Sequence, residues 1–528
     1  MLSDYILIFL VALLPFIYKY SFWFYTIQLK EYRWDRFKDY LFTPQWRSAI
    51  FNFWFFIEFP LFLLTITVLF DKTFEIITYQ VIFYFLLIQN IFVIGKIFRR
   101  KILKPKITWR LLITTIILSL WIATDLYWIF SSWHNAIIST YLIGILLFAP
   151  IIIFLCIWIS LPLVLYLKNK RMKKASIKSK NVKNTTIIWI TGSYWKSSVK
   201  EYLSSILEQE WKTLKTPENQ NTEMWVSNLI LRDLDDSYKY FVAEMWAYKR
   251  WEIETLWNIA NHKYGFLTAV WTQHIWLFWS IENTKKAKSE IAKKVEENKG
   301  TLYINWENEN VRSINFSKNI NIIKYWNTKW SDIVYNIKSS SDQETSFNIT
   351  YKNKNISFKT NLIWSHNILN LSWVIAFCID VWIDEKKLKE YVTHLSKPKN
   401  TLEIMKLPNY TLINDSYNLP ENWALAAIEV LSTYKWNKVL IMDDIFELWK
   451  RSEEIHVKLW KRIAEEWKVN KVLFIWSNFW GYFKKWLLDW WFLEINILNR
   501  IQEIEKWSTI LFEWRTSRKY LDKIIKWV

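Results

Sequence analysis

The chain has 528 residues, a formal net charge of +20 and two cysteines, Cys156 and Cys378. This length exceeds one hydrophobic core, so we expect roughly two to four domains. Two cysteines far apart in sequence exclude a disulfide-stapled scaffold and fit a reducing compartment. The positive charge favours anionic partners, namely a membrane surface, nucleotide phosphates or nucleic acid.

The balance of tryptophan and glycine is abnormal. There are 38 Trp and 6 Gly, whereas glycine normally makes up about 7% of residues. Trp211, Trp382 and Trp467 each follow a helical stretch, where the chain turns left-handed and glycine is favoured. One interpretation is a tryptophan-rich protein. The other, which we prefer, is that most of these codons are UGA, read as glycine in the cell; residues are named below as written.

Residues 1–167 hold long apolar runs, near the roughly 20 residues that span a bilayer. We expect five membrane-spanning helices there: Tyr5–Gln28, Phe51–Phe70, Ile76–Gly95, Leu111–Phe130 and Ala136–Leu167, the last kinked or split. Because more spans follow the first, a cleaved signal peptide is disfavoured. Basic segments follow spans one, three and five, which predicts a cell-membrane protein with its N-terminus outside and its C-terminus in the cytoplasm.

Two carboxylates, Glu58 and Asp125, lie inside predicted spans. Intramembrane carboxylates are costly and often functional; the alternatives are pairing in the interior or an interfacial position. Residues 168–184 form a basic segment, which we expect to be a linker able to bind anionic lipid headgroups.

From Thr185 onward, strand-like runs alternate with helical stretches. The runs are residues 185–191, 238–245, 264–270, 301–305, 438–444, 471–476 and 508–514. This alternation predicts parallel α/β sheets with helices on both faces. A boundary near Pro398 gives a multi-domain chain: a transmembrane domain at 1–167, a linker at 168–184, and α/β domains at 185–397 and 398–528.

The stretch TTIIWITGSYWKSSVKEYL predicts a strand, a turn and a helix that together bind phosphate. Backbone N–H groups and the helix N-terminus would hold the phosphates, Lys196 would reach the γ-phosphate, and Ser197 would bind Mg²⁺. The predicted ATP-binding residues of this loop are Gly192, Ser193, Tyr194, Trp195, Lys196, Ser197 and Ser198. The spacing departs from the full Walker A form at Ile190, and Trp195 as written would clash with a phosphate. The alternative is an ordinary strand–turn–helix.

With glycine at position 195, the loop resembles that of the Mur ligases, T-G-[ST]-x-G-K-[ST]-[ST]. The resemblance extends over residues 185–528, through several motifs in the family's order. It implies a P-loop ATP-binding central domain, a Rossmann-like C-terminal domain, and ATP and Mg²⁺ as cofactors.

The resemblance assigns further residues of the central domain. In TPENQNTEMWV, Asn221 and Thr222 would face the substrate. Glu244 stands where the family places a Mg²⁺-binding glutamate, His274 would be a metal ligand or phosphate contact, and Lys288 matches the lysine that is often carbamylated and would then hold a second Mg²⁺. The alternatives are a solvated strand end, a structural histidine and a solvated helical lysine.

The segment NLIWSHNILN resembles the family's L-x-G-x-H-N-x-x-N, which begins a helix near the adenine. His366, Asn367 and Asn370 are therefore predicted to lie at the nucleotide. The alternative is the ordinary polarity of a helix N-terminus.

In the C-terminal part, LINDSYNLP is similar to the family's D-D-S-Y-N-x-x-P. Asp415 would contact the nucleotide, and Tyr417 and Asn418 would lie beside it at the substrate. IMDDIFELW resembles G-D-M-x-E-L-G, and this set is most like the D-alanyl-D-alanine-adding (MurF) branch.

Two departures bear on substrate. Thr401 stands near the family's linker arginine, which puts that nucleotide contact in doubt. The N-terminal domain that holds the uridine nucleotide is missing, and the predicted membrane domain occupies its place.

The implied reaction is ATP-dependent amide formation. ATP phosphorylates an acceptor carboxylate, and an amine displaces phosphate, with Lys196, His274 and Lys288 as catalytic residues. The expected partners are ATP, a muropeptide-type acceptor, an amino acid or dipeptide such as D-Ala-D-Ala, and membrane lipid, without nucleic acid. One alternative is a poly-γ-glutamate-type polymer ligase, against which the D-S-Y-N motif argues. Another is a transporter or sensor with a nucleotide-binding domain, which would need signatures that the sequence lacks.

Overall fold

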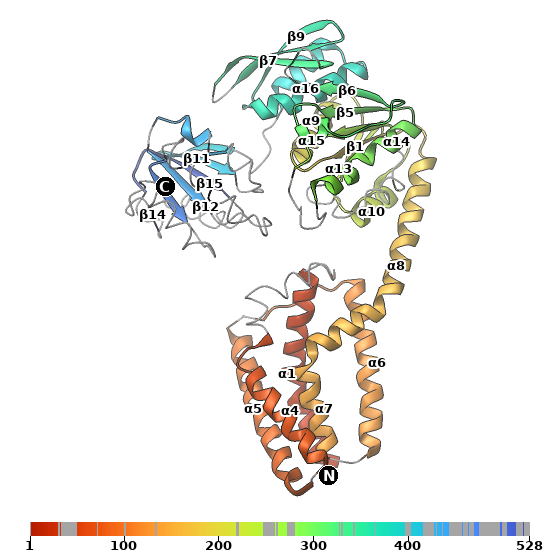
Figure 1. Cartoon of the computed structure of the whole chain (residues 1–528), viewed down its shortest axis with the longest axis vertical. Helices are drawn as coiled ribbons and strands as arrows, with labels where there is room; N and C mark the ends of the chain where they lie inside the picture. The colour runs from red at the N-terminus through yellow and green to blue at the C-terminus, as the bar shows by residue number, and fades with distance from the viewer. Residues whose placement is uncertain are drawn as a thin grey trace. The chain divides into compact units, whose positions relative to one another are not determined.

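The structure is a computed structural model of the full chain (Figure 1). It describes all residues except 1, 30–31, 33–49, 71, 100–101, 133–134, 218–220, 246–258, 260–261, 272–279, 327, 329–330, 342–343, 364, 396–402, 416–426, 429, 436, 443–456, 458–462, 464–468, 475–496, 499–503, 514–520 and 522–528. The chain divides into two compact units, Met1–Lys170 and Arg171–Val528.

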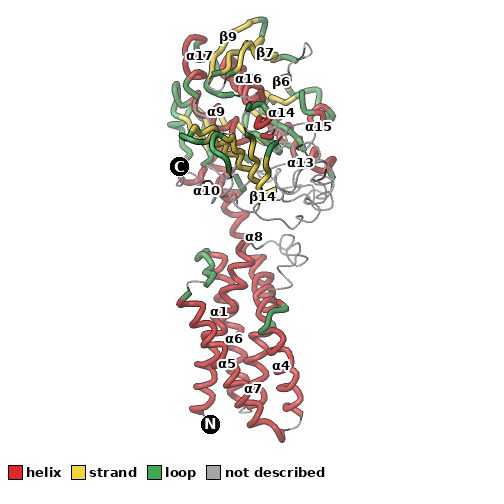
Figure 2. Tube along the Cα trace, turned by 90° about the vertical axis from the view of Figure 1, so that its left-hand side faces the viewer, coloured by secondary structure: helices red, strands yellow, loops and turns green. Residues whose placement is uncertain are grey.

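The first unit is a bundle of apolar helices (Figure 2). Its helices are α1 (Leu2–Leu29), α4 (Phe55–Phe70), α5 (Glu75–Phe98), α6 (Trp109–Ser132), α7 (Asn135–Leu147) and the first part of α8 (Ala149–Asn181), with a short 3₁₀ turn at Lys72–Phe74. Among the described residues, α1, α5, α6 and α8 are long and apolar enough to cross a membrane, whereas α4 and α7 are shorter apolar helices.

Each of the five predicted spans falls on helix, and the last one is divided. Helix α7 ends at Leu147 and α8 begins at Ala149. Pro150, in the first turn of α8, has no N–H to donate back into the preceding turn, which explains the break. The number of crossings stays a prediction.

The two intramembrane carboxylates have different surroundings. Glu58 is buried between helices and accepts hydrogen bonds from Lys19 of α1 and Gln89 of α5. Interior pairing is therefore the alternative that the structure supports for Glu58. Asp125 is half-buried and lines a cavity of about 240 Å³ together with Tyr141.

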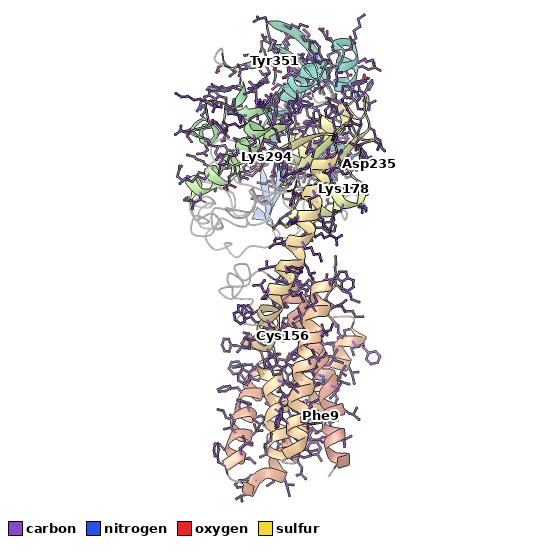
Figure 3. The ribbon with its side chains drawn as sticks, turned by 90° about the vertical axis from the view of Figure 1, so that its right-hand side faces the viewer. Phe9, Cys156, Lys178, Asp235, Lys294 and Tyr351 are labelled. Atoms are coloured by element: carbon purple, nitrogen blue, oxygen red, sulfur yellow. The ribbon has the colours of Figure 1, made fainter. Side chains whose placement is uncertain are left out.

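The segment predicted as a linker at 168–184 is helical as far as Asn181. In the second unit, Met172 and Ala175 are buried in the same apolar cluster as the first strand. Lys178 donates to the carbonyl of Leu231 at 2.9 Å, and its side chain lies near Asp235 (Figure 3). From Met172 onward the segment is thus a helix that packs on the central domain.

The central domain is built on a nine-stranded sheet in the order β2-β3-β1-β4-β5-β6-β7-β8-β9. The strands are β1 (Thr186–Thr191), β2 (Thr213–Lys215), β3 (Tyr240–Glu244), β4 (Tyr264–Leu267), β5 (Thr301–Asn305), β6 (Asn321–Tyr325), β7 (Ile333–Ser340), β8 (Thr345–Tyr351) and β9 (Lys354–Thr360). Pairing is parallel from β2 to β7 and antiparallel between β7, β8 and β9.

Both faces of this sheet are buried. The helices are α9 (Lys196–Leu207), α10 (Glu223–Asp233), α13 (Ile281–Ser289), α14 (Ile291–Glu297), α15 (Glu309–Arg312), α16 (Ser365–Asp380) and α17 (Glu385–Thr393). Successive side chains of a strand point to opposite faces. Accordingly Ile188 and Ile190 pack with α9 and α16, whereas Ile187 and Trp189 pack with α10 and α14.

The C-terminal domain has a separate six-stranded sheet in the order β10-β11-β15-β12-β13-β14. Its strands are β10 (Glu403–Lys406), β11 (Tyr410–Asp415), β12 (Lys438–Met442), β13 (Lys471–Phe474), β14 (Ile497–Leu498) and β15 (Ser508–Glu513). All pairs are parallel except β10 with β11. The seven predicted strands are confirmed, and two sheets stand on either side of the predicted boundary at 398, which itself lies outside the described residues.

Candidate active site

The predicted phosphate loop connects β1 to α9. Gly192 has φ +149°, and a Cβ there would lie 1.8 Å from Thr268 Oγ1, so the loop has no room for a side chain at this position. The backbone N–H of Ser193 donates to Ala269 at 2.7 Å, and Thr268 donates to the carbonyl of Tyr194 at 2.5 Å. The end of β4 therefore fixes the loop against the sheet.

Trp195 is the N-cap of α9 and has left-handed dihedrals, φ 63° and ψ 1°. Left-handed backbone costs an ordinary L-residue roughly 1–2 kcal/mol, and glycine tolerates it. The Trp195 indole stands parallel to the imidazole of His366, with ring centroids 6.4 Å apart. The Trp195 ring therefore faces His366, the residue predicted to lie at the adenine.

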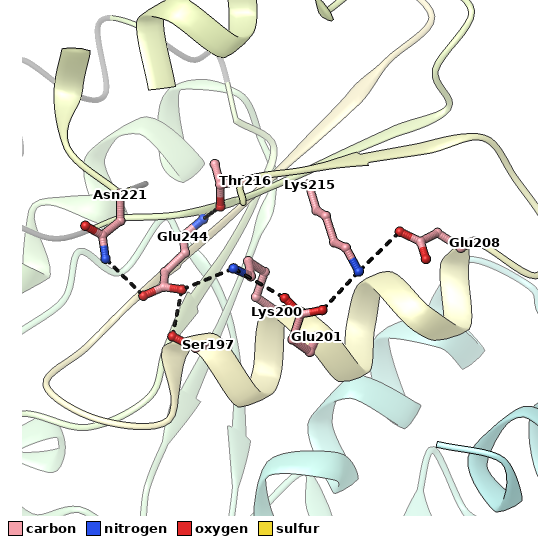
Figure 4. Close-up of polar contacts among 8 residues, drawn as sticks. All are labelled: Ser197, Lys200, Glu201, Glu208, Lys215, Thr216, Asn221 and Glu244. Atoms are coloured by element: carbon pink, nitrogen blue, oxygen red, sulfur yellow. Dashed lines mark hydrogen bonds and ion pairs between the residues drawn. The ribbon is translucent and has the colours of Figure 1, made fainter. Parts of the chain in front are cut away.

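Glu244 is the centre of a hydrogen-bonded cluster of polar side chains at the carboxyl edge of the sheet (Figure 4). It ends β3, which pairs with β1 in register Ile190↔Glu244. Its carboxylate accepts from Ser197 Oγ at 2.8 Å and from Asn221 Nδ2 at 3.3 Å. Its backbone N–H donates to Thr216 Oγ1 at 3.0 Å. The carboxyl ends of neighbouring parallel strands are where α/β sheets build ligand sites.

The donor set at this edge fits Mg²⁺. The ion takes oxygen ligands at about 2.1 Å in octahedral geometry, so two neighbouring ligand oxygens stand about 3 Å apart. Ser197 Oγ and Glu244 Oε2 are 2.8 Å apart. The hydroxyl and carboxylate are therefore correctly spaced to share one ion.

Two lysines are buried under the loop. Lys196 Nζ lies 3.4 Å from the carbonyl of Ser193; burial lowers its pKa, and Glu244 opposes this shift. Lys288, on α13, donates to the carbonyl of Gly192 at 3.0 Å. Burial, followed by repulsion from Lys196, lowers the pKa of Lys288 well below its ordinary value. The alternative of a solvated helical lysine is therefore wrong for Lys288.

The three predicted adenine-site residues begin α16. His366 is half-buried, and desolvation lowers the pKa of its imidazole to about 4, so the ring is neutral at pH 7. Asn367 donates to Ile363 at 2.7 Å and accepts from Tyr202 at 3.0 Å, so it ties the helix start to α9. Asn370 is fully buried, and neither end of its amide has a partner among the described residues.

In the C-terminal domain, Asp415 ends β11 and Glu513 ends β15, paired in register. Both are buried. Burial, followed by the charge of Asp415, raises the pKa of Glu513 well above its ordinary value. The pair therefore forms a buried carboxylate site at the carboxyl edge of this second sheet.

Comparison with known proteins places these features. Residues 190–378 match the family model described as the Mur ligase middle domain. The matched segment begins within β1 and ends within α16, so it contains the phosphate loop, Glu244 and the start of α16.

Curated relatives extend the similarity. The UDP-N-acetylmuramoyl-tripeptide--D-alanyl-D-alanine ligase of Buchnera aphidicola subsp. Baizongia pistaciae is 31% identical over 277 residues, 52% of this chain and 59% of the relative. The ligase of that name from Escherichia coli is 28% identical over 278 residues, 52% of this chain and 61% of the relative. The alignments thus span about three fifths of these relatives' length.

Solved structures share the fold. A structure of MurF from Acinetobacter baumannii superposes with a TM-score of 0.60 at 20% identity, covering 68% of this chain and 80% of that one. MurF ligase from Thermotoga maritima, in complex with ADP, gives a TM-score of 0.57 at 21% identity, covering 68% and 82%. At these identities the likeness establishes the fold.

Some predicted residues of the central domain and of the C-terminal domain fall outside the described residues. They are His274, Tyr417 and Asn418, and their roles stay predictions. Thr222 is described and is the N-cap of α10, next to Asn221. Ser198 lies buried in the first turn of α9.

The sequence reasoning missed Lys200, Thr216 and Glu513. Lys200 is fully buried, and its Nζ lies 3.5 Å from Glu244 Oε2 and 3.4 Å from Glu201. Lys200 follows Lys196 by four residues, so helical spacing places both side chains on one face of α9. This spacing is the sequence signal that could have identified Lys200 as a site residue. Glu513 could have been found from its place at the end of a predicted strand.

Proposed function

We propose that this chain is an ATP-dependent, ADP-forming carboxylate–amine ligase. The observation that carries the proposal is the edge site of the Mur ligase middle domain, where the phosphate loop, Ser197 and Glu244 meet. ATP phosphorylates an acceptor carboxylate, an amine attacks the acyl phosphate, and phosphate leaves. Such chemistry depends mainly on positioning and on neutralising phosphate charge.

The residues of the edge have separate roles in this proposal. Backbone N–H groups of residues 192–198 hold the phosphates, and Lys196 turns from the Ser193 carbonyl to the γ-phosphate. Ser197 and Glu244 hold Mg²⁺, which when bound neutralises phosphate charge. Asn221 orients the Glu244 carboxylate through its 3.3 Å hydrogen bond. Lys200 balances the charge of Glu244 from the other side.

We assign Lys288 as a carbamylated ligand for a second Mg²⁺. Carbamylation requires a neutral amine, and the burial of Lys288 against Lys196 favours that form. The carbamate would turn a cation next to Lys196 into an anion, which removes the repulsion. Loss of a ¹³C-carbonyl signal from ¹³CO₂-equilibrated protein on Lys288→Arg substitution tests the assignment.

The named relatives support a peptidoglycan-type substrate pair, an acceptor muropeptide and D-Ala-D-Ala. The aligned relatives are covered only in part, and residues 1–170 form a helix bundle. We propose that this bundle lies in the cell membrane with five crossings and both soluble domains in the cytoplasm. Exposed apolar side chains around its helices, such as Phe56, Ile91 and Ile116, support a lipid-facing surface.

We propose further that most tryptophans of the α/β part are glycine in the cell. Among the described residues, Trp195, Trp382 and Trp507 have positive φ. At the end of α16, Ile383 N–H donates to Cys378 and Trp382 N–H to Ile379, a Schellman motif with Trp382 at the position that favours glycine. Trp211 differs, because it is described and does not have positive φ. Trp467 lies outside the described residues.

The ligase proposal is tested with full-length protein carrying glycine at Trp189, Trp195, Trp246, Trp271 and Trp449. We expect phosphate release that needs ATP, Mg²⁺, a UDP-linked or lipid-linked muropeptide and D-Ala-D-Ala together. Hydrolysis of ATP that is indifferent to acceptor and amine would contradict ligation.

A further inference from the structure

The helix bundle of residues 1–170 contains a cavity of about 440 Å³. Pockets that bind small ligands measure roughly 300–1,000 Å³. The cavity is lined by residues of α1, α4 and α5 and by the junction of α7 and α8. Its position is internal to this unit, so it is separate from the edge site of the Mur ligase middle domain.

The cavity lies toward one end of the bundle. Its lining comes from the second half of α1, from Phe55 and Glu58 at the start of α4, and from the second half of α5 around Gln89. These helix ends adjoin the basic segments of the sequence around Lys38 and Lys101. By the positive-inside rule, this is the cytoplasmic half of the bundle.

A polar cluster of three side chains faces the cavity. Glu58 is 1% exposed and accepts from Lys19 Nζ and, at 3.1 Å, from Gln89 Nε2. The charges of Lys19 and Glu58 cancel, so the cluster is neutral. An ammonium group has three protons to donate, and Glu58 accepts one of them.

Gln89 has an unused acceptor in this cluster. Its side chain is 6% exposed, and its Oε1 accepts no hydrogen bond from the described residues. Buried polar atoms are paired in most proteins, so an unpaired one that lines a cavity marks the place of a missing donor. The donor must be small enough to reach Gln89 and must tolerate Lys19 beside it.

The remaining wall is largely aromatic. Tyr18, Phe22, Phe55 and Phe92 contribute rings to it. Trp23 and Trp54 also line the cavity, whereas the polar cluster of Lys19, Glu58 and Gln89 contains no tryptophan. An apolar wall around a neutral polar cluster fits a molecule with an apolar chain and an uncharged head.

We propose that this cavity binds an amphiphile with an apolar chain and a hydroxyl head, such as a diacylglycerol or a long-chain alcohol. The hydroxyl donates to Gln89 Oε1 and accepts from Lys19 Nζ, while the chain lies along the aromatic wall. An anionic phosphate head is disfavoured, because Glu58 already neutralises Lys19 and would repel a second anion.

The test uses full-length protein in phosphatidylcholine nanodiscs and photo-cross-linking lipids with a diazirine in the chain. The probes are dioleoylglycerol, a long-chain alcohol and dioleoylphosphatidic acid. We expect saturable labelling of α1, α4 or α5 by a hydroxyl-headed probe, and the better of the two names the source. Labelling that does not saturate, or stronger labelling by phosphatidic acid, would overturn the proposal.

Substitutions test whether the labelling depends on the polar cluster and on the cavity space. Gln89→Leu keeps the side-chain size but removes the acceptor, and we expect at least a fivefold loss of affinity for the hydroxyl-headed probe. Gln80→Leu, on the exposed side of the same helix, is the matched control and should leave the affinity unchanged. Val93→Phe, which fills the cavity, should also block labelling. Equal labelling of wild type, Gln89→Leu and Val93→Phe would refute the site.

Discussion

Two of the buried glutamates among the described residues lie in unrelated settings, and each contacts a lysine and a side-chain amide. In the helix bundle, Glu58 is 1% exposed and contacts Lys19 and Gln89. In the central α/β domain, Glu244 is 4% exposed and contacts Lys200 and Asn221.

The two glutamates differ in whether a hydroxyl group also donates a hydrogen bond to them. Glu244 also accepts from the Ser197 hydroxyl, which begins the helix after a phosphate loop. The Ser197 hydroxyl oxygen next to the Glu244 carboxylate could bind a cation, and the adjacent loop could bind a phosphate. The described partners of Glu58 are two nitrogen donors, of which Lys19 neutralises its charge. The cavity beside this cluster has a largely apolar wall. Burial of a carboxylate thus says little about its chemistry until its neighbours are known.

The largest expected effect falls on the phosphate-loop lysine. In protein with the five tryptophan-to-glycine substitutions named above, Lys196→Ala should reduce acceptor-dependent ATP turnover by more than about 100-fold, since lost transition-state charge stabilisation costs this much elsewhere. Circular dichroism should stay unchanged. Lys215→Ala is the matched control, because Lys215 pairs with Glu201 at the outer end of the same network and is one-third exposed. Equal losses in both variants would reject the phosphate-loop assignment.

The next effect distinguishes the two carboxylates that flank Lys200, namely Glu244 and Glu201, by their influence on Mg²⁺ dependence. Glu244→Gln should raise the Mg²⁺ concentration needed for half-maximal turnover by about tenfold or more, because an amide is a weaker ligand than a carboxylate. Glu201→Gln, which removes the other carboxylate near Lys200, should shift it less than twofold. A Mg²⁺ dependence unchanged by Glu244→Gln would place the metal elsewhere.

Glu58 should affect stability instead of turnover. Glu58→Gln leaves Lys19 without its counter-charge, which costs about 2 kcal/mol once discounted for the partial exposure of Lys19. Thermal unfolding of full-length protein in detergent should show the lower stability, with turnover on a soluble acceptor within twofold of wild type. The double variant Lys19→Met with Glu58→Met should recover most of the loss. A double variant as unstable as Glu58→Gln would show that the pair is not the cause.

Sequence alone predicted seven strands, namely β1, β3, β4, β5, β12, β13 and β15, because buried parallel strands are continuous apolar runs bounded by turns. The parallel strands β2, β6, β11 and β14 were missed. The antiparallel strands β7, β8 and β9 were also missed, since residues such as Ser346, Asn348 and Thr350 make one face polar. The edge site was predictable as far as Ser197 and Glu244, because Ser197 lies at the start of the helix after the phosphate loop and Glu244 ends a predicted strand. Lys19 and Gln89 were not, since helix packing brings them to Glu58 from 39 and 31 residues away.

The two regions also differ in their tryptophans. In the described α/β part Trp195, Trp382 and Trp507 have positive φ, whereas in the described helix bundle the residue with positive φ is Tyr32. This contrast fits glycine at many tryptophan positions of the α/β part and genuine tryptophan in the bundle. The gene sequence is the direct check: UGG at Trp195 would contradict recoding there.

The smallest expected effect is on stability, where two tryptophan-to-glycine substitutions should act in opposite directions. Trp382 is 91% exposed and has φ 68°, so Trp382→Gly loses little packing, relieves left-handed strain and should stabilise the central domain by about 1 kcal/mol. Trp225 is 51% exposed within α10, where glycine is a poor helix former, so Trp225→Gly should destabilise by about 0.5–1 kcal/mol. Differential scanning calorimetry of the full chain would measure both as opposite shifts of the central-domain transition. If both variants melt earlier, the end of α16 does not require glycine, and the conformational support for recoding at Trp382 is lost.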